Sequence, residues 1–314
     1  MIQARGLTKR YGATVAVNDL SFEVLPGRVT GFLGPNGSGK STTLRMELGL
    51  DAPTSGSVTV NGRPFSRHRR PLREVGALLD AKALHGGRSA YDHLLCLAQA
   101  SGLPRRRVDE VLDRVGMSSV AHKQAGGFSL GMGQRLGIAA ALLGDPGVLL
   151  FDEPVNGLDP EGIVWIRTLM RSLAAEGRTV FVSSHLMSEM AITADHLIVI
   201  GQGRLIAETS MADFIRSSSQ NHVRVRTPQP TELIRLLAAH GASTKEEPGT
   251  DGALSVTGLD CPTIGDLAAA HSIGLRELSP QQPSLEDAFM EMTHDAVDYR
   301  AEISPERALT GIGA

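Results

Sequence analysis

Residues 34–42 have the sequence GPNGSGKST, which fits the pattern Gly-x4-Gly-Lys-Ser/Thr of a phosphate-binding loop. Its glycines let backbone N–H groups converge on phosphate oxygens, its lysine can reach the terminal phosphates, and the following hydroxyl can ligate magnesium. The alternative is a glycine-rich turn, but the loop follows an apolar segment and opens a helical one. We therefore predict a nucleotide site formed by Gly34, Pro35, Asn36, Gly37, Ser38, Gly39, Lys40, Ser41 and Thr42, with Ser41 as a magnesium ligand.

Two acidic residues, Asp152 and Glu153, follow the apolar run at 148–151. The carboxyl ends of parallel strands face the ligand crevice of a sheet, so both side chains are expected at the nucleotide site. Asp152 would hold Mg²⁺ through water, and Glu153 would act as the general base for the attacking water. The alternative, two acidic residues that only cap a strand, is disfavoured by the phosphate loop in the same domain.

His185 follows another apolar run, TVFVSS at 179–184. A histidine at the end of such a strand can reach the γ-phosphate and hold the water and Glu153 in register. A single histidine after a strand is usually a surface residue. Only its position at the end of an apolar strand favours a functional role for His185. We therefore predict His185 as the second catalytic residue, beside Glu153.

The segment FSLGMGQR at 128–135 contains a Ser-x-Gly turn that opens a helix. Ser129 and Gly131 can grip a phosphate, because the start of a helix presents free backbone N–H groups. This turn has no partner phosphate within its own chain. It therefore implies that two copies of the chain close on ATP.

These motifs need a scaffold that brings strand ends together. Apolar strand-like runs at 29–33, 148–151, 179–183 and 196–200 alternate with helical segments, including 41–50 and 160–175, which predicts an α/β core with a largely parallel sheet. Residues 13–27 read as an antiparallel flap. The polar stretch 216–221 separates this part, placed at 1–216, from a small α+β unit at 222–295, with a polar tail at 296–314.

Composition restricts the classes of function. The formal net charge is −3, which gives no general case for nucleic-acid binding. No apolar run approaches the roughly 20 residues of a spanning helix, so no direct membrane span is expected. Cys96 and Cys261 match no metal or disulfide spacing, and Cys96, in the apolar run HLLCLAQA, is expected to be a buried thiol.

Over residues 2–215 the motifs, in this order, resemble the nucleotide-binding subunits of ATP-binding cassette (ABC) transporters. The resemblance implies a P-loop NTPase cassette with a RecA-like core, an antiparallel β flap and a helical subdomain, the last expected at 77–102. GPNGSGKS corresponds to Walker A, LLFDEP to Walker B, NGLDP to the D-loop and FSLGMGQR to the signature segment. It further implies that Tyr11 stacks on adenine, that Asp159 belongs to the D-loop, and that His185 is the switch histidine.

Four positions depart from the family pattern or from their surroundings. Leu130 and Met132 replace a glycine and a glutamine of the signature, whereas Ser129, Gly131, Gln134 and Arg135 are kept. Asp80 stands where the Q-loop has glutamine. Aspartate is a better magnesium ligand, so Asp80 is either a third metal ligand or a surface residue. Glu47 occupies a position that its neighbours Leu44 and Leu48 mark as apolar.

The segment PSLEDAFMEMT at 283–293 resembles the ending of drug-export ATPases of the daunorubicin and bacitracin resistance type. The resemblance implies an ATP- and Mg²⁺-dependent ATPase that works as a homodimer with an integral membrane permease, peripherally on the cytoplasmic face of the cell membrane. Export of drugs, antibiotics or other amphiphilic compounds is the expected activity. The alternatives are a soluble ABC ATPase of the ribosome-associated or iron–sulfur assembly type, and a regulatory module that only binds nucleotide.

Overall fold

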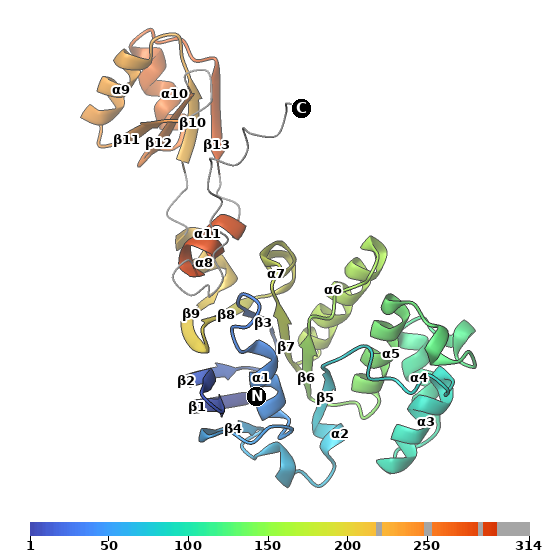
Figure 1. Ribbon diagram of the computed structural model, residues 1–314. Helices are drawn as coiled ribbons and strands as arrows, with labels where there is room; N and C mark the ends of the chain where they lie inside the picture. Colours follow the sequence, from blue (N-terminus) through green and yellow to red (C-terminus); the bar gives the residue numbers. More distant parts are fainter. Residues whose placement is uncertain (218–221, 248–252, 282–284, 294–314) are drawn as a thin grey trace, which may run out of the picture. The chain divides into compact units, whose positions relative to one another are not determined.

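The computed structural model describes residues 1–217, 222–247, 253–281 and 285–293 (Figure 1). Two compact units emerge, one over Met1–Met211 together with the residues from Met292 onward, and the other over Ala212–Glu291. The predicted tail at 296–314 and part of the polar stretch at 216–221 lie outside the described residues. Among the helices that the structure describes, none combines the length and apolar composition needed to cross a membrane.

A six-stranded sheet forms the centre of the first unit, with the strand order β5-β6-β7-β3-β8-β9. All neighbours are parallel except β8 and β9. Every residue of the predicted strand 29–33 is buried, as are those of the strand at 179–184, because both sheet faces are covered. The strands are β3 (Val29–Leu33), β5 (Val75–Leu78), β6 (Val148–Asp152), β7 (Thr179–Ser184), β8 (His196–Gly201) and β9 (Arg204–Ser210).

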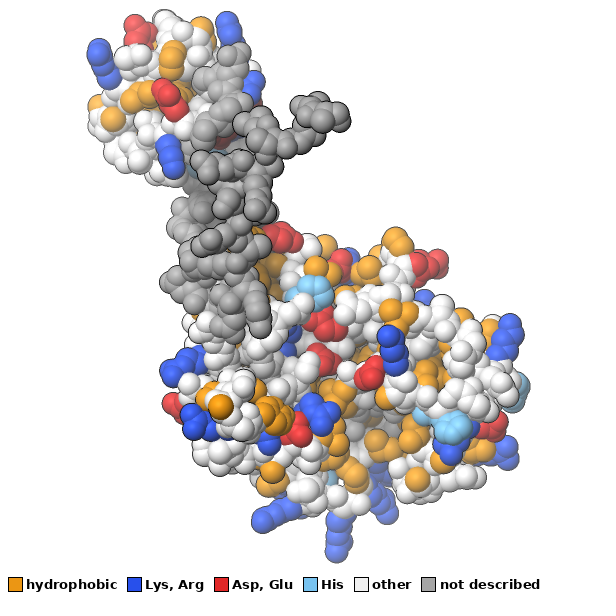
Figure 2. All heavy atoms as spheres, in the orientation of Figure 1, with side chains coloured by type: hydrophobic (Ala, Val, Ile, Leu, Met, Phe, Trp, Pro, Cys, Tyr) orange, Lys and Arg blue, Asp and Glu red, His pale blue; other side chains and the backbone are white. Residues whose placement is uncertain are grey.

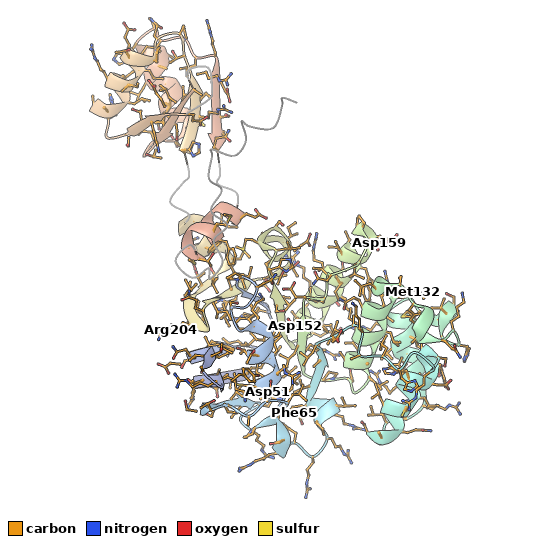
Figure 3. All side chains as sticks on the ribbon, in the orientation of Figure 1. Asp51, Phe65, Met132, Asp152, Asp159 and Arg204 are labelled. Carbon is orange, nitrogen blue, oxygen red and sulfur yellow. The ribbon has the colours of Figure 1, made fainter. Side chains whose placement is uncertain are left out.

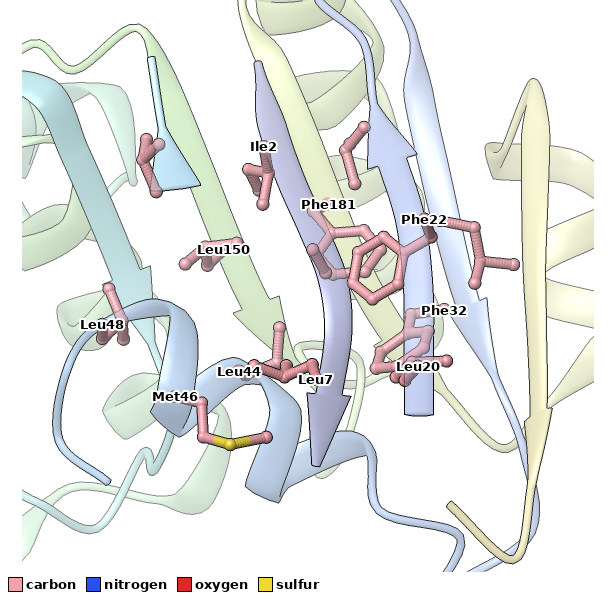
Figure 4. Close-up of a cluster of buried hydrophobic side chains, with 14 of the residues drawn as sticks. Ile2, Leu7, Leu20, Phe22, Phe32, Leu44, Met46, Leu48, Leu150 and Phe181 are labelled. Atoms are coloured by element: carbon pink, nitrogen blue, oxygen red, sulfur yellow. The ribbon is translucent and has the colours of Figure 1, made fainter. Parts of the chain in front are cut away.

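The predicted flap is an antiparallel sheet with the order β2-β1-β4, formed by β1 (Ile2–Tyr11), β2 (Thr14–Val24) and β4 (Ser55–Val60). Only β2 lies within the predicted range 13–27, and it is one continuous strand, whereas β1 and β4 come from outside that range. The apolar face of the sheet packs with the central sheet and with α1 (Lys40–Glu47) in one core (Figure 4). Phe22, Phe32 and Phe181 meet there with ring centroids 5.0–5.7 Å apart. This core fixes β3 and α1, the two elements that flank the phosphate loop.

The helical part of this unit is larger than predicted. Residues 77–78 belong to strand β5, so the expected helical segment 77–102 begins too early. Helix α3 (Ala90–Ala100) lies within the predicted segment, but α4 (Arg106–Arg114) and α5 (Leu130–Leu142) extend the helical part well beyond residue 102. Helix α6 (Pro160–Ala175) has the predicted bounds, and α2 (Pro71–Glu74) and α7 (Met187–Thr193) are short.

Two further expectations are wrong. Helix α1 ends at Glu47 and not at residue 50, because Gly49 adopts a left-handed conformation (φ 65°) and ends the helix. Cys96 is exposed, not buried. The buried stripe of α3 consists of Ala90, Leu94 and Ala98, and Cys96 lies two residues from Leu94, which places it on the opposite side of the helix.

Glu47 is almost fully buried, at 1% exposure, and neither carboxylate oxygen has a hydrogen-bond partner among the described residues. Burial raises the pKa of this carboxyl well above its usual value. The apolar neighbours of Glu47 correctly indicate a buried position, and Glu47 is a polar group without a partner in the core.

We expect Glu47→Met to stabilise the protein, because a buried polar group without a partner costs about 1–3 kcal/mol. In the wild type the unfolded chain loses this proton near pH 4.5 but the folded chain does not. The free energy of unfolding should therefore fall as pH rises above about 4.5, by at most roughly 1.4 kcal/mol per pH unit from this group.

Urea unfolding of wild type, Glu47→Met and Glu47→Gln between pH 4 and pH 8 measures both effects. Glutamine removes only the titration, so it separates the pH-dependent part from the cost of the buried polar group. A Glu47→Met protein that is no more stable than wild type at pH 8 would contradict this account.

The second unit is a four-stranded antiparallel sheet with the order β11-β12-β10-β13 and two helices on one face. Alternate residues of its central strand, Val223 and Val225, are buried against Leu233, Leu237 and Ile264. Its elements are β10 (His222–Arg226), β11 (Ser243–Glu246), β12 (Ala253–Thr257), β13 (Glu277–Gln281), α9 (Pro230–Ala239) and α10 (Cys261–Ala270), with α8 (Met211–Ser217) and α11 (Leu285–Thr293) at its ends.

Candidate nucleotide-binding and hydrolysis site

The phosphate loop lies between β3 and α1, in the predicted strand–loop–helix context. Gly39 precedes α1 in a left-handed conformation (φ 101°), and no side chain of the described residues caps the helix, so its first N–H groups can bind an anion. A β-carbon at Gly34 would lie 2.4 Å from Ser38 Oγ and 2.5 Å from a backbone oxygen of Ile200. Only glycine fits there.

Two polar groups inside the loop could donate hydrogen bonds to a phosphate. Ser38 Oγ is buried without a hydrogen-bond partner among the described residues. Lys40 Nζ donates to the backbone oxygens of Gly34 at 2.6 Å and Pro35 at 3.2 Å. Burial lowers the pKa of Lys40, and the negative charges of Glu153 and Asp152 oppose this shift. The lysine is thus held inside the loop, with both acidic residues close enough to act on its charge.

Asp152 ends strand β6, and Glu153 follows it with a left-handed backbone (φ 49°) that non-glycine residues rarely adopt. The Ser183 hydroxyl, on the adjacent strand β7, donates to Asp152 Oδ1 and accepts from the backbone N–H of Glu153 at 3.1 Å. One serine therefore fixes both acidic residues. The sequence analysis missed Ser183. Its role depends on the register that places it opposite Asp152.

The Glu153 carboxylate lies beside the phosphate loop. It lines a cavity of about 230 Å³ together with residues of the loop and its helix, including Gly39, Lys40 and Ser41. Glu153 Oε2 is 2.8 Å from His185 Nδ1. The structure thus brings together the two predicted catalytic residues from the ends of β6 and β7, at the cavity where a terminal phosphate would lie.

The residues present fit a magnesium ion that is also held by substrate. The described residues contain no group of three or more His, Cys, Asp or Glu placed to bind a metal. Magnesium bound with nucleotide needs only one or two protein ligands, because phosphates and waters supply the others. Ser41, which is exposed at the cavity, and Asp152 offer the hard oxygen donors that it prefers. Together they match this sparse type of site.

Tyr11, predicted to stack on adenine, is 47% exposed at the end of β1. Its hydroxyl donates to Asp51 Oδ2 at 2.9 Å, and Asp51 also pairs with Arg45 at 2.7 Å. These contacts hold the ring beside helix α1, which follows the phosphate loop. Lys9 Nζ lies over the Tyr11 ring, 4.9 Å from its centre, so stacking of adenine on this ring stays a prediction.

Asp80 is exposed two residues after β5, and its Oδ1 accepts from the backbone N–H of Lys82 at 2.7 Å. It does not line the cavity at the phosphate loop. The structure therefore gives Asp80 a local turn contact, and its ligation of magnesium stays a prediction.

The signature turn lies at the start of α5, where Ser129 and Leu130 are exposed and Gly131 is half-buried. Ser129 caps this helix, with its Oγ accepting from the backbone N–H of Met132 at 3.3 Å. Neither Ser129 nor Gly131 lines the phosphate-loop cavity of its own chain. This arrangement agrees with the expectation that the turn serves a phosphate held by another copy.

Leu130, one of the departures from the family pattern, packs over the D-loop. A β-carbon at Gly157, where φ is 76°, would lie 2.2 Å from Leu130 Cδ2, and one at Gly131 would lie 3.0 Å from the Gly157 backbone oxygen. The signature turn and the D-loop of one chain are therefore in direct contact. Leu130 fills the space that the missing side chain of Gly157 leaves.

Gln134 and Arg135 have structural contacts that tie the signature helix to its surroundings. Gln134 Nε2 donates to the backbone oxygen of Asn156 at 3.1 Å, and the Arg135 guanidinium lies 4.4 Å from the ring centre of Trp165. Asp159 caps α6 by accepting from the N–H of Gly162 at 2.9 Å. Figure 3 shows Asp152 at the end of the sheet and Met132 and Asp159 on the neighbouring helices α5 and α6.

Comparison with known proteins agrees with this geometry. The family model described as ABC transporter matches residues 17–156, and a domain of unknown function (DUF8746) matches 221–286. The bacitracin transport ATP-binding protein of Bacillus licheniformis is 36% identical over 93% of this chain and 97% of its own length. A lantibiotic transport ATP-binding protein of Streptococcus pyogenes is 38% identical over 66% of this chain and 90% of its own length.

Solved structures extend the comparison. One ATP-binding subunit of an ABC transporter has a TM-score of 0.63 and 26% identity, covering 69% of this chain and 92% of the other. A dimeric ATP-binding cassette in a post-hydrolysis state with ADP and Pi has a TM-score of 0.61 and 25% identity, covering 67% and 99%. The fold is the predicted ABC cassette, and the chain belongs to the ATP-binding, ATP-hydrolysing subunits of ABC transporters.

Proposed function

We propose that this chain supplies the energy for export of antibiotic-like, amphiphilic compounds through a separate membrane permease, on the cytoplasmic face of the cell membrane. The observation that carries the proposal is the 2.8 Å contact between Glu153 and His185 beside the phosphate loop, because a chain that only binds nucleotide needs no such pair. The export direction and cargo class rest on relatives named for bacitracin, lantibiotic and Nod factor transport or export.

Two copies of the chain would close on two ATP molecules in a head-to-tail dimer with two-fold symmetry. Lys40, Ser41 and Asp152 of one copy hold each ATP, while Ser129 and Gly131 of the other copy complete the site. The exposed signature turn and its absence from the cavity of its own chain support this division. Tyr11 stacks on adenine and Asp159 lies at the dimer contact.

Hydrolysis then proceeds by in-line attack of water on the γ-phosphate, which breaks the bond between the γ-phosphorus and the bridging oxygen and releases ADP and phosphate. Glu153 takes the proton of that water, and His185 holds the carboxylate through its ring nitrogen. Lys40 and the N–H groups at the start of α1 stabilise the negative charge that spreads over the phosphate oxygens. Magnesium, when bound with ATP by Ser41 and Asp152, would neutralise phosphate charge, and Asp80 is a candidate further ligand.

If a neighbouring gene encodes an integral membrane protein, co-expression of that protein with this chain tests the transport role. We expect the two to purify together in detergent, and cells carrying both to tolerate higher concentrations of peptide antibiotics than cells carrying either alone. Glu153→Gln should keep the complex and remove the tolerance. Co-purification with ribosomes in place of a membrane protein would contradict the proposal and support a soluble ABC ATPase.

A further inference from the structure

The connection between β4 and β5 is strongly basic. Between residues 63 and 73 it contains five exposed arginines, although the whole chain has a net charge of −3. Its acidic residue, Glu74, ends the connection and accepts a hydrogen bond of 3.1 Å from Asn61. Within the part of the chain that the structure describes, none of the five guanidinium groups forms an ion pair or a hydrogen bond. This arginine segment consists of Arg63, Arg67, Arg69, Arg70 and Arg73.

The backbone of the arginine segment is held in place at both ends. At its start, Val60 and Arg63 exchange backbone hydrogen bonds of 2.8 and 3.1 Å, and the His68 ring lies 3.0 Å from the Val60 backbone oxygen. At its other end, a β-carbon at Gly144 would lie 1.8 Å from the Leu72 backbone oxygen, so α2 packs directly on the residues after α5. The arginines therefore extend from a fixed backbone, and their unpaired charges are not a feature of a loose loop.

Three of the arginines surround a small cavity of about 210 Å³. Arg69, Arg70 and Arg73 line one side, and Ala100, Ser101 and Leu103, where α3 ends, line the other. Arginine presents a planar fork of donors that matches phosphate oxygens, and the residues opposite carry no charge that would compete for the arginines. The chemistry of this cavity fits the phosphate of a larger molecule.

The nucleotide of the hydrolysis site cannot be that molecule. The arginine segment precedes β5, whereas Asp152 and Glu153 follow the parallel neighbour β6, so the two sites lie at opposite ends of the sheet. Figure 2 shows Lys and Arg side chains projecting from the lower edge of this unit, below the position of α2 in Figure 1. The segment is a separate surface.

We propose that the arginine segment binds the headgroups of anionic phospholipids at the membrane surface beside the permease. This inference rests on the proposed transport role, which places the chain within reach of the bilayer. Clusters of four to eight basic residues near a membrane attract anionic lipids, each contributing roughly a five-fold gain in affinity. The arginines lie on a loop, a short turn (Phe65–Arg67) and α2 and do not follow one groove, which suits a lipid surface better than an acidic peptide.

Sedimentation with vesicles tests the proposal on the full chain without permease or ATP. We expect binding to vesicles of phosphatidylcholine with about 30% phosphatidylglycerol, no binding to phosphatidylcholine alone, and weakening as salt rises. The triple variant Arg69→Gln, Arg70→Gln, Arg73→Gln should bind roughly 100-fold more weakly. All variants should keep the wild-type ATPase rate in solution, because the segment is remote from the hydrolysis site.

The matched control is Arg105→Gln with Arg106→Gln. Arg105 lies over the Tyr91 ring at 5.7 Å and Arg106 faces Glu110 at 4.0 Å, so the charges of these two arginines already have partners within the chain. The control variant should therefore bind vesicles as wild type does. The triple change to lysine keeps the charge and should retain most of the binding.

Three results would overturn the proposal. The first is equal binding of wild type and the glutamine variant to anionic vesicles. The second is release by inorganic phosphate but not by chloride of equal ionic strength, which would identify a site for a free anion. The third is a glutamine variant that binds vesicles as well as wild type does but no longer purifies with the permease in detergent. That result would assign the segment to a protein contact. Failure of the transport role would show only in the permease experiment.

Discussion

Glu153→Gln is expected to lower ATP turnover by a factor of about 10²–10⁴, the usual contribution of a general base, while ATP binding persists. Glutamine keeps the size of the side chain and can still contact His185, but it cannot accept the proton of the attacking water. Because closure on ATP precedes hydrolysis in this mechanism, the variant should accumulate as an ATP-bound dimer. Steady-state ATPase assays and gel filtration with ATP measure these two results.

Glu161→Gln is the matched control, since it makes the same chemical change at an exposed side chain in the first turn of α6. It should hydrolyse ATP at the wild-type rate and show no stable dimer. Normal turnover by Glu153→Gln would rule out Glu153 as the base, whatever its contact with His185.

Ser129→Arg is expected to abolish ATP-driven dimerisation and to reduce turnover at least about 100-fold, because the arginine would occupy the place of the second copy's phosphate and remove a phosphate donor. Binding of ATP to the single chain should be unchanged, since Ser129 does not line the cavity of its own phosphate loop. Fluorescent-nucleotide titration measures binding, and gel filtration with the Glu153→Gln background measures closure.

The loss of a helix cap has to be separated from this effect. Ser129 caps α5 and Ser89 caps α3 in the same way, each accepting from a backbone N–H three residues on. Ser129→Ala and Ser89→Ala should each lower stability by about 1 kcal/mol. Only the change at Ser129 should lower turnover. Loss of both ATP binding and closure in Ser129→Arg would mean that the residue serves the fold.

The core of the fold could be predicted because its strands are continuous apolar runs, such as residues 29–33 and 179–184, and its helices carry clear stripes. Strands β9 and β13 lack such apolar runs, and the sequence analysis did not predict them. Every residue of β9 is exposed or half-buried, and β13 contains Pro280, which is tolerated because β13 is an edge strand. The error at Cys96 has a related cause: HLLCLAQA is apolar on several sides, so packing alone decides which side is buried.

The candidate site was predictable where one local motif carries the chemistry, as in the phosphate loop. Contacts between distant segments were not. Ser183 holds Asp152 and Glu153 only because β7 lies beside β6 in that register. Leu130 reads as a departure from a pattern until it is placed against Gly157, whose left-handed backbone brings two loops together. Neither relation has a signature within a single segment.

Mixing two inactive variants tests most directly whether ATP is shared between copies. Lys40→Ala removes the phosphate lysine, and Ser129→Arg blocks the signature turn, so neither homodimer has a complete site. A mixed dimer has one intact site, formed by Lys40 of one copy and Ser129 of the other. We predict that equal mixing restores about one quarter of wild-type ATPase activity if copies pair at random. Activity equal to the sum of the separate variants would contradict the shared site.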